Sequence, residues 1–265
     1  MLLRGDGIHK TFARQRRLFR SDNESAPALT NVSFSLRENE TLAVVGESGA
    51  GKSTLGRVVA QLIEPDAGQV MLDDRDISRL RGQEQLTFRK SVQMIFQDAH
   101  SSLDPRRTIG DSISEPMLIH FGASRAERRT AVRDLLGRVG LDAGMADTLP
   151  RQLSGGQLQR VAIARALSMD PRVIVCDEPV SALDVSVQAQ VLNLLKDLQA
   201  ERGMSYLFIT HDLSVVEAFA SRVMVMRSGQ VIESGSVDEI FDSPTHDYTK
   251  SLLASIPNPV PKSLR

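Results

Sequence analysis

The residues best suited to chemistry lie in a glycine-rich stretch between an apolar run, Leu42–Val45, and a run typical of a helix, Leu55–Ile63. A strand, a glycine-rich turn and a helix N-terminus together form a phosphate-binding loop, because backbone N–H groups and the helix dipole converge on an anion. The lysine can reach the β- and γ-phosphates of a nucleotide, and the hydroxyl after it can ligate Mg²⁺. The residues of this P-loop, all expected to bind nucleotide, are Gly46, Glu47, Ser48, Gly49, Ala50, Gly51, Lys52, Ser53 and Thr54.

Two acids, Asp177 and Glu178, end a second apolar run, Val173–Cys176. A continuous apolar run is typical of a strand buried on both faces, and ligands of parallel sheets gather at the carboxyl ends of such strands. Asp177 is therefore predicted to hold Mg²⁺, directly or through water, and Glu178 to act as general base on an attacking water. An exposed turn is the alternative for a pair of acids, but the P-loop upstream favours catalysis.

Gln97 and His211 also follow runs that predict strands, Ser91–Phe96 and Tyr206–Thr210. Gln97 can contact the metal or the attacking water, which completes a predicted metal set of Ser53, Gln97 and Asp177. His211 can hydrogen-bond the γ-phosphate or fix the water. A lone histidine is more often structural, so its predicted role rests on its place at a strand end.

A second glycine pair begins another helical run, Leu158–Leu167. Glycines at a helix start, preceded by a serine, form a further anion site. One nucleotide does not need two cradles in one chain, so we expect this one to serve a nucleotide held by another chain. Its residues, called the signature segment below, are Leu153, Ser154, Gly155, Gly156 and Gln157.

Composition limits the classes of protein to which this chain can belong. A net charge of −1 and the absence of tryptophan give no support for nucleic-acid binding. The single cysteine, Cys176, excludes an internal disulfide. No apolar run approaches 18 residues and the N-terminus lacks a signal-peptide core, so we expect the chain to stay in the cytoplasm.

The order of elements predicts an α/β fold with a parallel core and an inserted helical subdomain. We expect the core at 1–98 and 170–235, the helical insert at 99–169, and an appendage at 236–265. The segment Ala13–Ala26, rich in arginine, is either a solvated loop or a contact with anionic phospholipid. Strands are expected at Leu2–Phe12 (an edge strand), Asn31–Arg37 and Gln69–Leu72, with a hairpin of Val223–Met226 and Gln230–Glu233; helices are expected at Ile113–Val139 and Val187–Gln199.

Together these motifs resemble the ATP-binding subunit of an ABC transporter, over the whole chain. The resemblance implies the α/β fold of the P-loop NTPases, with a mixed or parallel RecA-like core, an antiparallel β subdomain and an inserted helical subdomain. The resemblance implies a head-to-tail dimer that holds ATP and Mg²⁺ between the P-loop of one chain and the signature segment of the other. It also assigns Phe12 to stacking on adenine and Asp184, in the segment 181–184, to the site in trans. From the residues alone, Phe12 is more often a core residue.

The segments 177–194, 96–106 and 245–253 resemble the oligopeptide and dipeptide importer branch, which includes nickel and glutathione systems. Departures occur at Asp104, where the branch usually has Asn, and at Asp247, where it usually has Pro. The resemblance implies an ATPase at the cytoplasmic face of the inner membrane, with a second ATPase subunit, two membrane-spanning permeases and a solute-binding protein. The alternatives are a different solute, an exporter, or a soluble ATPase acting on ribosomes or DNA.

Overall fold

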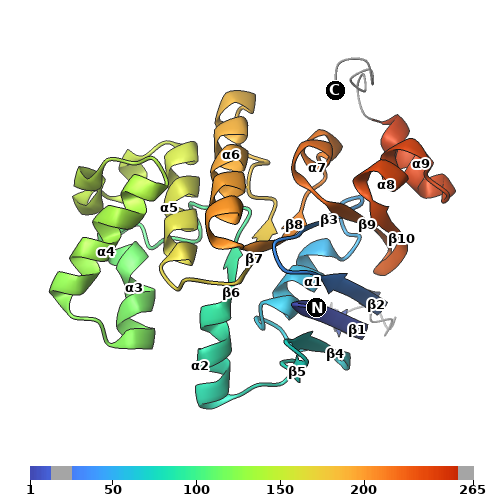
Figure 1. The fold of residues 1–265 in the computed structure, drawn as a ribbon, viewed down its shortest axis with the longest axis horizontal. Helices are drawn as coiled ribbons and strands as arrows, with labels where there is room; N and C mark the ends of the chain where they lie inside the picture. The colour runs from blue at the N-terminus through green and yellow to red at the C-terminus, as the bar shows by residue number, and fades with distance from the viewer. Residues whose placement is uncertain (13–25, 256–265) are drawn as a thin grey trace, which may run out of the picture.

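Two β-sheets form the centre of the molecule, and a group of helices lies beyond one end of them (Figure 1). The computed structural model describes residues 1–12 and 26–255. The basic segment that the sequence suggested as a phospholipid contact, Ala13–Ala26, lies almost entirely outside these residues. Helix α1 (Lys52–Val59) contributes Leu55, Val58 and Val59 to the apolar core between the two sheets.

The antiparallel sheet has the strand order β2-β1-β4-β5. Its strands are β1 (Leu3–Phe12), β2 (Ala26–Leu36), β4 (Ala67–Leu72) and β5 (Arg75–Asp76). The sequence prediction of β1 as an edge strand is wrong, because Leu3 pairs with Leu36 on one side and with Leu72 on the other. In β2 the alternation was predicted correctly, since Val32, Phe34 and Leu36 are buried.

The larger sheet is mixed, with the strand order β10-β9-β3-β8-β7-β6. All neighbours run parallel except β10 against β9, which form the predicted hairpin. The strands are β3 (Thr41–Val45), β6 (Val92–Ile95), β7 (Val173–Asp177), β8 (Ser205–Ile209), β9 (Arg222–Arg227) and β10 (Gln230–Ser236).

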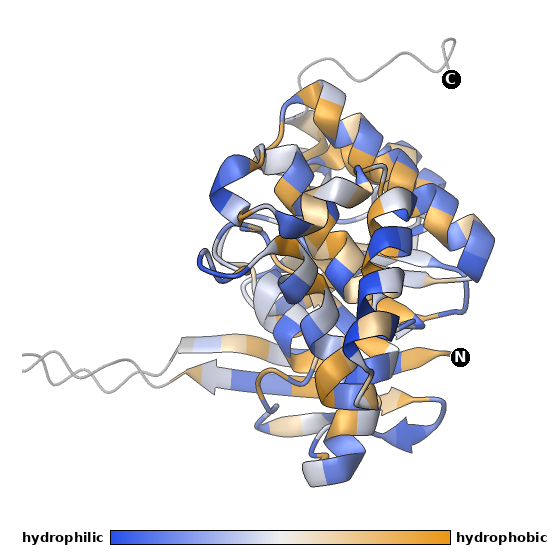
Figure 2. Ribbon diagram, turned by 90° about the vertical axis from the view of Figure 1, so that its left-hand side faces the viewer, coloured by the Kyte–Doolittle hydropathy of each residue, from blue (hydrophilic) through white to orange (hydrophobic). Residues whose placement is uncertain are grey.

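Both faces of this sheet are covered, which explains its continuous apolar runs. In β3, Leu42 and Val44 pack toward α1 and the antiparallel sheet. Ala43 and Val45 on the opposite face pack against α7 (Leu213–Phe219) and residues near the C-terminus. The helices that cover the sheets carry both apolar and polar residues, as expected when one face alone is buried (Figure 2).

Residues 99–169 contain helices and no strand, as the sequence predicted. Instead of one run, the predicted helix at 113–139 is two helices, because Gly122 ends the first with a φ of 62°. Helix α2 was not predicted; its one buried residue, Phe88, gives little periodic signal. The helices of this segment are α3 (Ile109–Phe121), α4 (Arg125–Arg138) and α5 (Gly155–Leu167), with short 3₁₀ turns at Ala143–Asp147 and Pro150–Gln152. Helix α2 (Gly82–Ser91) precedes the segment, and α6 (Val185–Arg202) follows it after β7.

The C-terminal residues of the described chain form α8 (Val237–Asp242) and α9 (Asp247–Ala254). They lie in the segment that the sequence predicted as an appendage, and they pack against the core. Ile240 and Tyr248 are buried in the same apolar cluster as one face of β3 and β9. These two helices therefore belong to the packed body of the protein up to Ala254 (Figure 1).

Candidate functional site

The P-loop turns from β3 into α1 with the backbone that its glycines permit. Gly46, Gly49 and Gly51 have φ values of 146°, 82° and 100°. A Cβ atom on Gly46 would lie 2.1 Å from the Met226 carbonyl oxygen, and one on Gly51 would lie 2.4 Å from that of Ala28. Glycine is thus required at two of these positions by close approach as well as by conformation.

Lys52 lies at the start of α1 and is only 6% exposed. Its Nζ donates hydrogen bonds to the Gly46 and Glu47 carbonyl oxygens, at 2.7 and 2.9 Å. Burial lowers the pKa of Lys52, against the raising effect of the Glu178 and Asp177 carboxylates. The Lys52 ammonium is therefore bound by carbonyl oxygens of the P-loop itself, and an anion with more negative charge than these carbonyls can draw it out of these hydrogen bonds.

Ser53 and Asp177 meet although they are far apart in the sequence. The Ser53 Oγ donates a hydrogen bond of 2.8 Å to Asp177 Oδ1 at the end of β7. Burial raises the pKa of Asp177, which is 4% exposed, while the Ser53 hydrogen bond and nearby cations oppose that rise. A hydroxyl and a carboxylate side by side form a hard oxygen donor set, which fits the predicted Mg²⁺ ligands.

Glu178 lies at the centre of the expected catalytic group. Its Oε2 accepts a 2.9 Å hydrogen bond from Gln97 Nε2, and its Oε1 lies 3.1 Å from His211 Nδ1. Its φ of +49° is uncommon outside glycine, and its backbone N–H is held by the Ile209 carbonyl at 2.9 Å. The backbone of Glu178 is thus strained, as is frequent in active sites, and its carboxylate is held between Gln97 and His211.

These side chains surround one cavity of about 550 Å³, which is within the usual range for a small-molecule site. They follow four parallel neighbours of the mixed sheet, β3, β6, β7 and β8, at their carboxyl ends. The lining residues are Ala28, Ser48, Gly49, Ala50, Gly51, Lys52, Ser53, Thr54, Gln97, Glu178 and His211. The structure therefore brings together the P-loop, Gln97, Glu178 and His211, with Asp177 directly behind Ser53.

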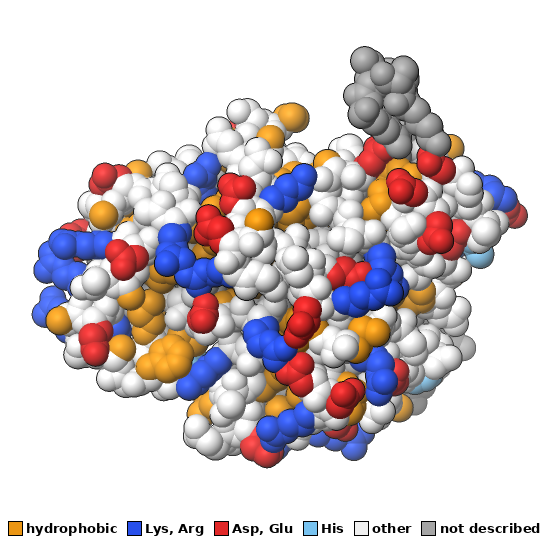
Figure 3. All heavy atoms as spheres, in the orientation of Figure 1, with side chains coloured by type: hydrophobic (Ala, Val, Ile, Leu, Met, Phe, Trp, Pro, Cys, Tyr) orange, Lys and Arg blue, Asp and Glu red, His pale blue; other side chains and the backbone are white. Residues whose placement is uncertain are grey.

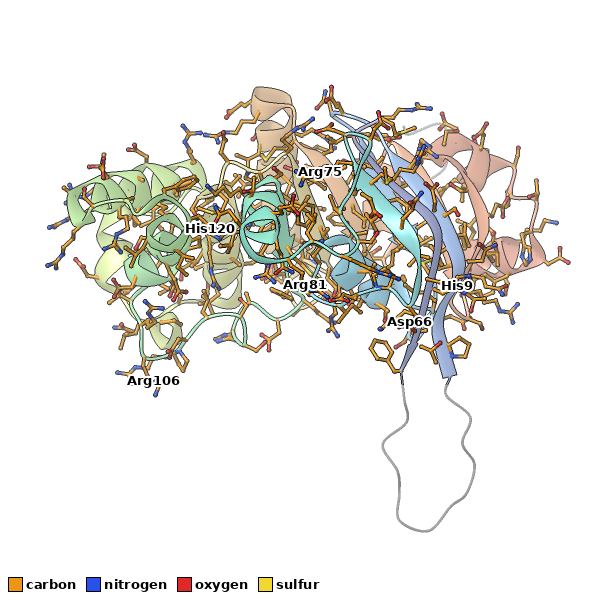
Figure 4. The ribbon with its side chains drawn as sticks, turned by 90° about the horizontal axis from the view of Figure 1, so that it is seen from below. His9, Asp66, Arg75, Arg81, Arg106 and His120 are labelled. Carbon is orange, nitrogen blue, oxygen red and sulfur yellow. The ribbon has the colours of Figure 1, made fainter. Side chains whose placement is uncertain are left out.

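Phe12 does not line this cavity. It ends β1 and is 46% exposed, with Lys10 Nζ 5.8 Å from the ring centroid. Asp66, labelled in Figure 4, fixes this end of the strand by accepting hydrogen bonds from Thr11 N and Lys10 Nζ, both at 2.7 Å. An exposed ring on a fixed strand end is available for stacking, and its contact with adenine stays a prediction.

The signature segment also lies outside the cavity. Ser154 caps α5 by a reciprocal pair of hydrogen bonds: Gln157 N donates to Ser154 Oγ at 3.3 Å, and Ser154 N donates to Gln157 Oε1 at 2.9 Å. Ser154 and Gly155 are exposed, while a Cβ on Gly156 would meet Val187 Cγ1 at 2.4 Å. Nearby, exposed Asp184 caps α6 by accepting from Val187 N at 3.0 Å. The capped N-terminus of α5 is thus exposed on the surface of the protein.

Sequence reasoning missed Tyr248, whose hydroxyl accepts a 3.1 Å hydrogen bond from the Glu47 backbone N–H. It also missed Ala28, whose carbonyl approaches Gly51. The available signal for Tyr248 was an apolar spacing with Leu252, four residues apart, in a stretch taken as polar. Nothing in the sequence indicated that this stretch lies beside the P-loop.

Comparison with known proteins agrees with this site. The sequence pattern of the ABC transporter family matches residues 29–181. The dipeptide transport ATP-binding protein DppF of Haemophilus influenzae is 47% identical over 264 residues, covering 100% of this chain and 80% of that protein. The oligopeptide transport ATP-binding protein AppF of Bacillus subtilis is 47% identical over 252 residues, or 94% of this chain and 76% of the relative. The chain belongs to the ABC transporter family.

Solved structures give the same fold. A dimeric structure of an ATP-binding cassette in a post-hydrolysis state, bound to ADP and phosphate, has a TM-score of 0.79 and 31% identity, covering 89% of this chain and 99% of the other. The cbiO1 structure from Clostridium perfringens has a TM-score of 0.77 and 28% identity, covering 91% of each chain. The predicted fold class and the resemblance to peptide-importer ATPases are both confirmed, and the chain is an ATP-binding transporter ATPase.

Proposed function

We propose that this chain hydrolyses ATP to energise the import of peptides through a membrane transporter. The observation that carries this proposal is the position of Glu178, hydrogen-bonded to Gln97 and beside His211, across one cavity from Lys52. The transport of peptides rests on the names of relatives such as the dipeptide transport protein DppF of Escherichia coli, 45% identical over 264 residues.

The residues divide the work of phosphoryl transfer. Lys52 leaves the Gly46 and Glu47 carbonyls for the β- and γ-phosphates, which carry more negative charge. Ser53 and Asp177 would hold Mg²⁺, which neutralises phosphate charge when bound, and Gln97 is the further predicted contact to metal or water. Glu178 takes a proton from the attacking water, while His211 orients the water or bonds the γ-phosphate.

The site is completed by a second chain. The dimeric structure of a neighbour that contains ADP and phosphate supports a dimer, and the open signature segment fits a nucleotide held by the partner chain's P-loop. Leu153 to Gln157 and Asp184 would then contribute in trans. The partner is either a paralogous ATPase or a second copy.

The membrane-spanning partners have a candidate contact on α3. Exposed apolar side chains gather over the lower end of this helix (Figure 3), where Lys90 Nζ lies 4.5 Å from the centroid of the Phe121 ring. A groove of about 270 Å³, lined by Phe96, Ile119 and His120 among others, adjoins this end. We infer that a permease segment docks here and that the helices transmit closure of the dimer to it.

No helix within residues 1–12 and 26–255 has the length and apolar character to cross a bilayer. The relatives named as dipeptide transport ATP-binding proteins support a place for this chain as a peripheral subunit at the cytoplasmic face of the inner membrane, attached through separate permeases that receive solute from a binding protein. The solute is a di- or oligopeptide in this proposal. A non-peptide solute is the second candidate, because the glutathione import protein GsiA of Pectobacterium atrosepticum is 49% identical over 230 residues, 87% of this chain and 37% of that protein.

Glu178→Gln tests the proposed chemistry. Its steady-state ATPase rate in the assembled complex is expected to fall by about 10²–10⁴-fold, the usual contribution of general base catalysis. ATP binding should persist, since the amide keeps the size of the side chain. The matched control is Glu201→Gln on the exposed surface of α6, expected to be fully active. A normal rate in Glu178→Gln would remove Glu178 from the mechanism.

A further inference from the structure

Helix α9 contacts the nucleotide-binding loop directly. The Tyr248 hydroxyl accepts a 3.1 Å hydrogen bond from the Glu47 N–H, although 201 residues separate them. Tyr248 is only 7% exposed, so its hydroxyl reaches the loop from within the packed protein. A hydrogen bond to a buried acceptor limits the directions in which that peptide group can turn.

The same peptide group is held from its other side by Lys52. The Gly46 carbonyl and the Glu47 N–H belong to one planar peptide unit. Its oxygen accepts from Lys52 Nζ at 2.7 Å, while its N–H donates to Tyr248. Because this peptide unit is rigid, the hydrogen bond to Tyr248 orients the Gly46 carbonyl oxygen. That oxygen in turn positions the Lys52 ammonium in the absence of nucleotide.

Tyr248 is itself fixed. The Arg227 guanidinium carbon lies 4.7 Å from the centroid of the Tyr248 ring, a cation–π contact. The start of α9 is anchored on Glu233 of β10, which accepts hydrogen bonds from Thr245 N and Thr245 Oγ1, both at 2.7 Å, and from His246 N at 3.2 Å.

The β9–β10 hairpin touches the P-loop at two further points. The Gly229 N–H donates a 3.0 Å hydrogen bond to the Ala50 carbonyl. The Met226 carbonyl lies so close to Gly46 that a Cβ there would be 2.1 Å away. The hairpin and α9 thus form one support along the outer side of the loop.

We propose that Tyr248 is a positioning residue for ATP binding, which orients the Gly46–Glu47 peptide so that Lys52 is placed to receive phosphate. This rests on the proposed nucleotide site. The effect falls on binding more than on the chemical step, since the peptide forms part of the cradle before water attacks. Loss of the Tyr248 hydroxyl should therefore raise KM for ATP and leave kcat nearly constant.

Tyr248→Phe tests the proposal by deleting the hydroxyl alone. The Kd of the purified full chain for ATP, and KM in the assembled transporter, should each rise roughly threefold to tenfold, the effect of one hydrogen bond. Amide hydrogen exchange at Glu47 should also accelerate, because its N–H loses its acceptor.

The chain provides a matched control, since it has only two tyrosines. Tyr206 is also buried, and its hydroxyl donates a 2.9 Å hydrogen bond to the Leu195 carbonyl, away from the P-loop. Tyr206→Phe should lower the melting temperature as Tyr248→Phe does, but should leave KM, Kd and exchange at Glu47 unchanged.

The outcomes separate this inference from the proposed function. Wild-type affinity in Tyr248→Phe, or an equal loss in both phenylalanine variants, would overturn the positioning role. Failure of the wild-type chain itself to bind ATP would instead contradict the nucleotide site on which the inference depends. Weaker binding confined to Tyr248→Phe, with faster exchange at Glu47, supports it.

Discussion

The P-loop and the signature segment are alike in sequence but differ in what surrounds them. Both place glycines at the start of a helix, α1 or α5. The P-loop contacts β7 through the Ser53–Asp177 hydrogen bond, and α9 through the Glu47–Tyr248 hydrogen bond. Among the residues that the structure describes, the side-chain hydrogen bonds that hold the start of α5 run between Ser154 and Gln157 alone.

This difference fits the proposal that the P-loop is positioned within its own chain, whereas the signature segment contributes to a nucleotide held by a partner chain. Contacts from distant strands give the P-loop a fixed geometry and a cavity opposite Glu178. Ser154 caps the start of α5, and both Ser154 and Gly155 are exposed, so a ligand can approach them from solvent. We infer that the first segment determines nucleotide affinity in a single chain, and that the second acts only when two chains meet.

Lys52→Ala is expected to have the larger effect of the two variants that test this comparison. It removes the cation nearest the phosphates, so the ATPase rate should fall about 10²–10³-fold, as for loss of one preorganised electrostatic donor. ATP binding by the isolated chain should weaken as well. Lys196→Ala on the exposed face of α6 serves as the control and should match the wild type. A fully active Lys52→Ala would contradict the role of the P-loop lysine.

Gly155→Glu should separate binding from turnover. A Cβ at Gly155 lies 3.7 Å from its nearest neighbour, Leu183 Cδ2, so a side chain fits without strain. A carboxylate there would face the phosphates held by the partner chain, and like charges in an interface cost several kcal/mol. Turnover in the assembled complex should fall at least roughly tenfold, while ATP binding by the isolated chain stays unchanged.

Gly137→Glu is the matched control for that variant. Gly137 is exposed on α4, and within residues 1–12 and 26–255 no atom beyond its own stretch of helix lies within 4 Å of its Cβ position. The same charge is therefore added to another helix without a phosphate nearby, and both binding and turnover should be unaffected. Loss of binding in the isolated Gly155→Glu chain would contradict the division between the two cradles.

Much of the site was predictable because its chemistry is concentrated in short motifs. The glycines of the P-loop and the acids after β7 are local patterns, and parallel strands bring their carboxyl ends together. Gln97 and His211 were placed by the same rule, and both lie beside Glu178. Strand ends in a buried parallel sheet thus gave the positions of four separate segments.

What could not be predicted depends on long-range pairing. The pattern of Leu3–Phe12 fits an edge or an inner strand equally well, and only β4 decides that β1 is central. The stretch around Tyr248 is mostly polar, and its anchor is Glu233 in a distant strand, which accepts hydrogen bonds from Thr245 and His246, so the burial of Tyr248 has no local sign in the sequence. No local sequence rule joins that stretch to the P-loop.

The smallest predicted effect concerns Glu233→Gln, which weakens the support of the P-loop. Burial raises the pKa of Glu233, but the neighbouring Thr249 side chain and the hydrogen bonds from Thr245 and His246 outweigh burial and lower the pKa to about 2. Because the folded-state pKa is depressed, the carboxylate stabilises the fold fully above its ordinary value of 4.5, and this contribution is lost as the pH falls toward 2. The variant should melt about 2–4 °C below the wild type at pH 7.

Thermal unfolding between pH 7 and pH 3 checks this prediction. The difference between wild type and Glu233→Gln should stay constant down to about pH 5 and shrink below it, because protonation of Glu233 produces the same loss in the wild type. Glu201→Gln should show no such change. A difference that persists unchanged at low pH would mean that the charge of Glu233 does not hold α9. Helix α9 would then be held by the apolar packing of Tyr248 and by its contact with Arg227, and not by the charge of Glu233.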